Sequence, residues 1–125
     1  MCACLFGCQI QRENDQWYSA EYSTFSVSDE VGLYTLSVGG YSGDAGDALA
    51  GTINPLWDAN NKPFSTPDRD NDDCPACSCA ALRYHGWWFG YCTYSSLNYD
   101  FMLSIWETVN HVYEVTTSRM FVKLY

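Results

Sequence analysis

The residues best suited to chemistry are concentrated in one stretch, FSTPDRDNDDCPACSCA, which spans residues 64–80. It contains four aspartates and three cysteines, namely Asp68, Asp70, Asp72, Asp73, Cys74, Cys77 and Cys79. Carboxylates close to cysteines allow three interpretations: a calcium-binding loop, a zinc site, or a solvated turn that disulfides hold together.

Alternating carboxylates favour calcium among the metals. Asp68, Asp70 and Asp72 bring several oxygen ligands onto one short turn, and calcium takes about six to eight oxygens. An EF-hand loop starting at Asp68 would need glycine at its sixth position and glutamate at its twelfth, where this chain has Asp73 and Cys79. The sequence therefore excludes an EF-hand, and leaves open both another kind of calcium loop and an ordinary acidic turn.

Zinc is the alternative that the cysteines raise. Four sulfurs could come from Cys74, Cys77, Cys79 and Cys92. However, the CPAC motif has no second CxxC partner, and the neighbouring aspartates are hard ligands that do not favour a thiolate site. Disulfides are therefore the preferred interpretation of these cysteines.

Seven cysteines in 125 residues indicate an oxidising compartment, so we expect an extracellular, secreted protein. The odd count requires at least one thiol that is free or paired with another chain. Cys2, Cys4 and Cys8 cluster in the first residues, MCACLFGC, which lack the basic region of a signal peptide. One explanation is that the chain is the tail of a longer exported protein.

Composition limits the other possible functions. A chain of 125 residues with 47% hydrophobic and 17% aromatic residues suits a single domain with a core. A net charge of -9, with scattered basic residues, argues against nucleic-acid partners, and no stretch is long enough for membrane insertion. His85 and His111 have no partners in a hydrolase arrangement, so no enzyme is expected, and His85 is interpreted as a surface or turn residue.

Hydrophobic periodicity predicts an α+β domain with much loop. Residues 1–16 look atypical, with cysteines followed by a polar run. Strand-like alternation follows at Tyr22, Phe25 and Val27, and again from Leu33 to Val38, around the hairpin turn SDEVG. Further expected elements are a short helix at 45–50, a loop at 52–73, a helical start to 95–106 and strand in 111–125. Trp87 and Trp88 are expected in the core.

From about Trp17 to Tyr125 the chain resembles the C-terminal part of the fibrinogen C-terminal domain family, which includes ficolins, tachylectins, angiopoietins, tenascins and fibrinogen chains. The segments that carry this resemblance are YSTFSVSDEVGLYTLSVGGYSGDAGDALAG, KPFSTPDRDNDD, CAALRYHGWWFGYC, SSLN, IW and RMFVKL. The resemblance implies strands with short helices and a loop-rich calcium subdomain. It also implies that residues 17–125 form part of a longer domain, with residues 1–16 as an atypical segment.

The resemblance assigns the acidic loop to one structural Ca²⁺. Its side-chain ligands would be Asp70 and Asp72, and its carbonyl ligands would come from about Cys74 and Ala76. The family's C-terminal disulfide corresponds to Cys79–Cys92. Cys74 and Cys77, which resemble the extra cysteines of angiopoietins, would pair with each other.

The resemblance also implies a ligand pocket beside the calcium. A cis peptide at Ser78–Cys79 would shape it, and further walls would come from the surroundings of Arg83, from Cys92 and from Thr93. Many family members have histidine where this chain has Thr93, and the segment 98–106 is much shorter than theirs. The resemblance therefore supports the calcium site more strongly than the pocket.

Three functions follow from the resemblance. The first is a secreted, calcium-stabilised recognition module that binds acetylated glycans in innate defence. The second is an angiopoietin-like module that binds a receptor protein, and the third is an incomplete fragment without independent function. Family members often act as oligomers, so the full-length protein could also form one.

Overall fold

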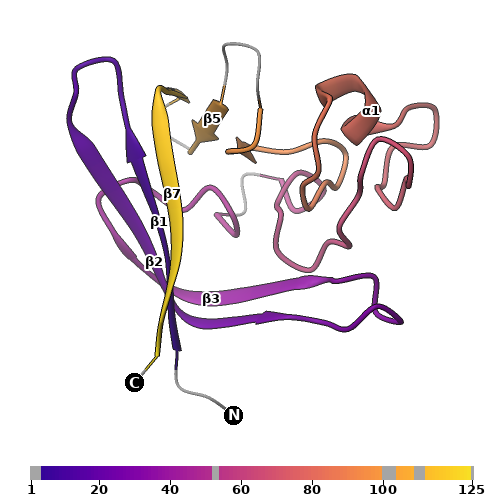
Figure 1. Ribbon diagram of the computed structural model, residues 1–125, viewed down its shortest axis with the longest axis horizontal. Helices are drawn as coiled ribbons and strands as arrows, with labels where there is room; N and C mark the ends of the chain where they lie inside the picture. Colours follow the sequence, from indigo (N-terminus) through magenta and orange to yellow (C-terminus); the bar gives the residue numbers. More distant parts are fainter. Residues whose placement is uncertain (1–3, 52–53, 100–103, 109–111, 125) are drawn as a thin grey trace.

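The computed structural model of the chain describes residues 4–51, 54–99, 104–108 and 112–124. A four-stranded antiparallel sheet has the strand order β3-β2-β1-β7, and a small three-stranded sheet has the order β4-β5-β6. The bounds are β1 Cys4–Gln11, β2 Trp17–Val27, β3 Leu36–Gly43, α1 Cys79–Arg83, β4 Ser95–Ser96, β5 Ser104–Glu107, β6 Val112–Val115 and β7 Thr117–Leu124. In Figure 1 β1, β2 and β7 lie at the left, β3 runs along the bottom toward the right, and α1 with its loops lies at the upper right. The α+β class is confirmed.

One face of the larger sheet forms much of the core. Phe6 and Cys8 of β1 lie opposite Tyr22 and Ala20 of β2, and all four side chains are buried. This follows from the two-residue period of a strand, which sends alternate side chains to the same face. On the opposite face a Cβ at Gly7 would meet the ring of Phe121, so glycine makes room for that ring.

Residues 4–11, within the segment that the sequence made atypical, form strand β1 of the larger sheet. β1 lies between β2 and β7, and its hairpin with β2 closes at the pair Gln11↔Trp17, across the boundary that the sequence suggested. The physical reason is the alternation of apolar side chains at Phe6, Cys8 and Ile10, which are 3%, 0% and 0% exposed. The cluster of cysteines obscured this strand pattern.

Two other predicted elements differ from the structure. Residues 45–50 form no helix, because Gly46 has a φ of 83°, although Ala45, Ala48 and Leu49 are buried as a helix face would be. The start of 95–106 is β4, which pairs with β5 at Ser95↔Trp106, and not a helix.

The strands predicted on either side of the SDEVG turn are found, but their connection is longer than expected. Leu33 and Tyr34 belong to that connection, with φ angles of 57° and 54°. Their backbone N–H groups donate to the carbonyls of Glu30 and Asp29, which closes a tight turn. At the other end of the chain the predicted strand region appears as β6 and β7.

Large aromatic side chains connect the sheet to the loops. Trp87 and Trp106 are 1% and 0% exposed, which confirms Trp87 as a core residue. Trp106 donates from Nε1 to the Gly46 carbonyl at 2.9 Å, and Trp88, which is half-buried, donates to the Tyr34 carbonyl at 2.9 Å. Within the described ranges, no helix is both long and apolar enough to cross a membrane.

We expect Tyr22→Phe to reduce the free energy of unfolding by about 1–3 kcal/mol, because the fully buried Tyr22 hydroxyl donates to Asp47 Oδ1 at 2.7 Å. Urea unfolding measures the change. Tyr91→Phe is the matched control, since the Tyr91 side chain is 44% exposed, and it should cost much less. Equal losses for the two variants would show that this buried hydrogen bond contributes little.

Candidate functional site

The acidic loop folds back on its own first residues. Ser65 is buried and exchanges two backbone hydrogen bonds with Trp87, at 3.0 and 3.1 Å. Asn71 then donates from its backbone to Ser65 Oγ at 3.0 Å and from its side chain to the Phe64 carbonyl at 2.9 Å. The core tryptophan therefore positions the start of the loop, and Asn71 positions the aspartates on either side of it.

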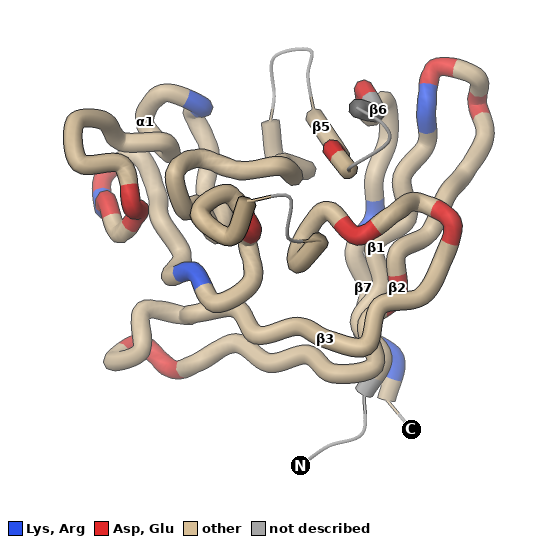
Figure 2. The backbone as a smooth tube through the Cα atoms, turned by 180° about the vertical axis from the view of Figure 1, so that it is seen from behind, with Lys and Arg blue, Asp and Glu red and all other residues tan. Residues whose placement is uncertain are grey.

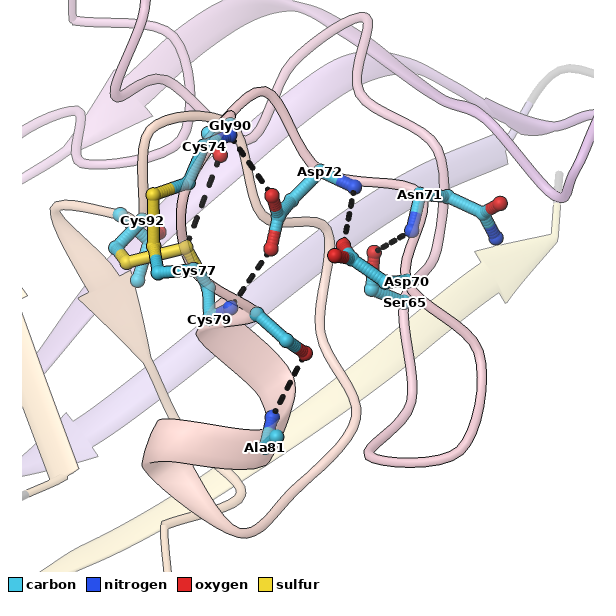
Figure 3. Close-up of a disulfide and its surroundings, with 12 residues drawn as sticks. Ser65, Asp70, Asn71, Asp72, Cys74, Cys77, Cys79, Ala81, Gly90 and Cys92 are labelled. Atoms are coloured by element: carbon cyan, nitrogen blue, oxygen red, sulfur yellow. Dashed lines mark hydrogen bonds between the residues drawn. A yellow bond between two sulfur atoms is a disulfide. The ribbon is translucent and has the colours of Figure 1, made fainter.

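The four aspartates of the loop separate into two groups. Asp68 accepts from the Thr66 hydroxyl at 2.7 Å, and Asp73 forms an ion pair with Lys62 at 2.6 Å. Asp70 and Asp72 instead lie beside each other, as Figure 3 shows, and Asp70 Oδ1 accepts from the Asp72 backbone at 3.1 Å. These are the two carboxylates that the resemblance to the family implied as calcium ligands.

Asp72 fastens the loop to the helix that follows it. Its Oδ1 accepts from the Cys74 backbone at 2.8 Å, and its Oδ2 accepts from the Cys79 backbone at 2.7 Å (Figure 3). Burial raises the pKa of Asp72, the two backbone donors oppose this rise, and the neighbouring Asp70 adds to it. A cation beside the pair would relieve the repulsion between the two carboxylates.

The donor atoms of this loop fit calcium in chemical type. Carboxylate oxygens of Asp70 and Asp72 are adjacent, and each carboxylate has more lone pairs than its hydrogen bonds use. The Cys74 carbonyl accepts only a long hydrogen bond from Cys77, at 3.4 Å, and Ala76 is exposed in the same turn. Hard oxygens of this kind suit calcium better than zinc.

The cysteines of the loop form disulfides. Cys74 pairs with Cys77 and Cys79 pairs with Cys92, with Cα–Cα distances of 5.3 Å in both. Three of these sulfurs, from Cys77, Cys79 and Cys92, lie close together, but all are in disulfides and none is a thiolate for zinc. On the chain-entropy model, the longer closed loop stabilises the fold by roughly 3 kcal/mol.

Cys8, one of the clustered N-terminal cysteines, lies in the core beside the larger sheet. Cys8 is a free cysteine of the core, and burial raises the pKa of its thiol to about 12, which makes the thiol unreactive. Cys2 lies outside the described residues. The pairing partners of Cys2 and Cys4 therefore stay open, as the sequence left them.

The peptide bond before the longer disulfide differs from what the resemblance implied. There is no cis peptide bond among the described residues, so the Ser78–Cys79 bond is trans. Ser78 is extended, with φ -112° and ψ 110°, and its Oγ accepts from the Ala81 backbone at 3.3 Å. Ser78 is therefore the N-cap of α1, and its side chain starts the helix.

The other implied pocket residues do not all face one surface. Cys79 is buried, while Arg83 and Cys92 are half-buried. Thr93 is 2% exposed and donates its hydroxyl to the Ser95 carbonyl at 2.7 Å, so this side chain is turned inward. The structure brings Cys79 and Cys92 together through their disulfide, and leaves Ser78 and Arg83 at opposite ends of α1.

The structure also forms a cavity that the sequence did not indicate. Its volume is about 200 Å³, and its lining consists of Leu33, Tyr34, Phe64, Thr66, Arg69 and Asn71. None of the five implied pocket residues is part of this lining. The β2–β3 connection and the acidic loop form it together, and no local sequence pattern signals that two such distant segments meet.

His85 lies in the bend that follows α1, as a turn residue would, but it is buried, which corrects the expectation of a surface position. It is 8% exposed, with Nδ1 at 3.0 Å from the Gly86 carbonyl and Nε2 at 2.7 Å from Ser96 Oγ. In the neutral tautomer that satisfies both contacts, Nδ1–H donates to the carbonyl and the Ser96 hydroxyl donates to Nε2. Burial lowers the pKa of His85, so the neutral form is favoured and ties β4 to the end of α1.

Comparison with known proteins identifies what this architecture is similar to. The family model for the C-terminal globular domain of fibrinogen beta and gamma chains matches residues 4–115. A solved structure of lamprey fibrin D-dimer, in complex with the peptide Gly-His-Arg-Pro-amide, superposes with a TM-score of 0.82 at 26% identity. That superposition covers 97% of this chain and 45% of the lamprey chain.

Two curated proteins show the range of relatives. Fibrinogen-like protein 1 of Rattus norvegicus is 46% identical over 83 residues, which is 63% of this chain and 26% of the relative. The techylectin-like protein of Phoneutria nigriventer is 38% identical over 100 residues, which is 80% of this chain and 39% of the relative. The chain thus spans well under half the length of these relatives.

We expect the stability of the protein to fall as the pH drops below about 6.5, the ordinary histidine pKa, because His85 binds a proton more readily when unfolded. His85→Asn should reduce the stability at pH 7.5 and also flatten its pH dependence between pH 7.5 and 5.5. Urea unfolding of both proteins across that range measures the effect. An unchanged slope in the variant would assign the pH dependence to other groups.

Proposed function

Because this chain belongs to the fibrinogen C-terminal domain family, we propose that it is a calcium-stabilised recognition module that acts outside the cell. The match over residues 4–115 confirms the resemblance seen in the sequence. The two disulfides are in keeping with such a module.

The observation that carries this proposal is the double role of Asp72. Its carboxylate holds the backbone of Cys74 and Cys79 while Asp70 lies beside it. Bound Ca²⁺ would supply positive charge that both carboxylates need, with the carbonyls of Cys74 and Ala76 completing the protein ligands. The side chains of Asp70 and Asp72 then keep the loop in place, and through Cys79 they position α1 and the segment around Cys92.

Acetylated glycans are the proposed ligands, in a lectin-like role in innate defence. The support comes from the techylectin-like relative, which aligns with 80% of this chain. The binding surface would lie along α1 and include the half-buried Ser78, Arg83 and Cys92, with the buried Cys79 behind it. Thr93 would support this surface from the interior without contacting the ligand, because its hydroxyl donates to the Ser95 carbonyl.

A receptor protein or another polypeptide is the second candidate ligand. Two observations favour it: the inward orientation of Thr93, and the exposure of Leu82 on α1 and of its C-cap residue Tyr84, at 61% and 74%. Exposed aromatic and aliphatic side chains of this kind are typical of the centre of a protein interface. The lamprey fibrin structure, which contains a peptide ligand, agrees with this candidate.

We expect calcium to raise the melting temperature of the oxidised protein by several degrees relative to chelator. A ligand at about a hundredfold above its dissociation constant adds about 2.7 kcal/mol of stability. Asp70→Asn should abolish this rise, because it removes one of the two charges. Asp68→Asn is the matched control, since Asp68 bonds to Thr66 instead, and should keep the rise. Loss of the rise in both variants, or in neither, would contradict the assigned site.

The two ligand candidates separate in a competition experiment. If the module is lectin-like, its binding to N-acetylated surfaces should be competed by N-acetylglucosamine and not by glucose, and Arg83→Ala should weaken it. If the ligand is a protein, Leu82→Ala and Tyr84→Ala should weaken receptor capture while both sugars leave it unchanged. If the protein shows no cooperative melting transition, this chain does not fold alone, and the function would belong to a longer protein.

A further inference from the structure

Two disulfides lie side by side at the start of α1. The Sγ atoms of Cys77, Cys79 and Cys92 all lie within 4.8 Å of one another. Cys77 is bonded to Cys74, whereas the other two form the longer disulfide. Figure 3 shows these sulfurs gathered in one place. A sulfur of the shorter disulfide is therefore next to the bond of the longer one, which is the arrangement that thiol–disulfide exchange requires.

One carboxylate keeps the two disulfides together. Asp72 accepts from the Cys74 backbone through one oxygen and from the Cys79 backbone through the other, at 2.8 and 2.7 Å. Cys92 is held separately, because its carbonyl accepts from the Gly90 backbone at 2.9 Å. These backbone contacts do not depend on how the sulfurs are paired, so a change of pairing leaves the sulfurs near one another.

The two disulfides differ in their access to solvent. Cys79, at one end of the longer disulfide, is 0% exposed, and Cys92 is half-buried. Cys74 and Cys77 are also half-buried, but both residues between them, at positions 75 and 76, are exposed. A small thiol therefore reaches the shorter disulfide more easily than the longer one, and the rate of exchange follows such access.

The positions of the sulfurs indicate the order of bond changes. Cys77 is the end of the shorter disulfide that lies against the longer one, so attack from solvent falls on Cys74 and releases Cys77. A new Cys77–Cys92 bond requires the two Sγ atoms to approach from at most 4.8 Å to about 2 Å. The sulfur that leaves is then that of Cys79, which lies 3.9 Å from the Gly90 carbonyl, an acceptor for the thiol that forms.

We propose that Cys74 is a modification site for small thiols, and that Cys77, once released, takes over Cys92 from the longer disulfide. In the first step the small thiol gives its proton to water, and its sulfur bonds to Cys74 and breaks the Cys74–Cys77 bond. In the second step the Cys77 sulfur bonds to Cys92, and the Cys79 sulfur leaves and takes up a proton. The product has one mixed disulfide, one protein disulfide and one buried thiol, so the small thiol is the only co-reactant.

The charge of the acidic loop favours a thiol that carries a positive charge. Residues 68–73 contain four aspartates and one arginine, and Figure 2 shows these acidic positions beside α1. Lys62 pairs with one of them, Asp73, at 2.6 Å. In the absence of calcium, a cationic aminothiol is therefore attracted toward Cys74 and an anionic thiol is repelled.

The oxidised protein in chelator tests this inference, so that the outcome does not depend on the calcium proposal. The probe is cysteamine and the anionic control is mercaptopropionate, with each rate divided by the rate of the same thiol on a small neutral disulfide. Acid quenching and non-reducing peptide mapping by mass spectrometry identify the bonds. We expect cysteamine on Cys74, a new Cys77–Cys92 bond and a thiol at Cys79, formed at least about threefold faster than with mercaptopropionate.

Two single substitutions test the second step without any added thiol. Cys74→Ser leaves Cys77 as a thiol beside the longer disulfide, and should move that bond to Cys77–Cys92. Cys77→Ser is the matched control, since it leaves a thiol at Cys74 instead, and should keep the Cys79–Cys92 bond. We expect at least about tenfold more transferred bond in the first variant than in the second, because proximity raises the effective concentration of the attacking sulfur.

Two results would overturn the proposal. One is cysteamine on Cys74 with a thiol at Cys77 and an intact Cys79–Cys92 bond, or no reaction at Cys74. The other is a Cys74→Ser protein that keeps the Cys79–Cys92 bond. If that variant does not fold, the reaction of the unsubstituted protein decides alone. Equal normalised rates for the two thiols would contradict the preference for a cationic thiol.

Discussion

The hydrogen bonds of one carboxylate, that of Asp72, hold the turn between the acidic loop and α1 in place. Asp72 accepts from Cys74 through one oxygen and from Cys79 through the other, so both ends of the disulfide-containing turn are fixed to it. The Cys79–Cys92 disulfide then links this turn covalently to the segment before β4. Because Asp70 is adjacent, the arrangement concentrates negative charge where it also fixes the backbone, and this is the physical argument for a cation.

The sheet and the loops depend on each other through a few buried side chains. Trp87 pairs with Ser65 at the start of the acidic loop, and Trp106 reaches from β5 to the Gly46 carbonyl. These buried contacts therefore fix how the loops pack against the sheet. The acidic loop thus carries the aspartates and the disulfides, while β7, at the edge of the larger sheet, carries the exposed Met120, Val122 and Leu124.

Much of the architecture could be predicted where the pattern is local. The alternation in residues 17–27 and 117–124 gives strands. The loop residues alone left calcium, zinc and disulfides open, and the resemblance to the family supplied both disulfide pairings, which the structure shows. Features that depend on distant partners were missed. His85 is buried against Ser96 and the rings of Phe89 and Tyr99, and Thr93 turns inward to reach Ser95. Gly46 breaks a helix pattern through one backbone angle, which hydrophobic periodicity does not register.

The central claim is that calcium binds at Asp70 and Asp72 and thereby orders the turn that leads to Cys79. Amide hydrogen exchange by NMR, with calcium and with chelator, tests it most directly. We expect calcium to slow exchange at the Cys74 and Cys79 amides, which donate to Asp72, and to leave exchange in the β1–β2 pairs unchanged. Exchange at those two amides that does not respond to calcium, in a protein whose sheet is protected, would contradict it.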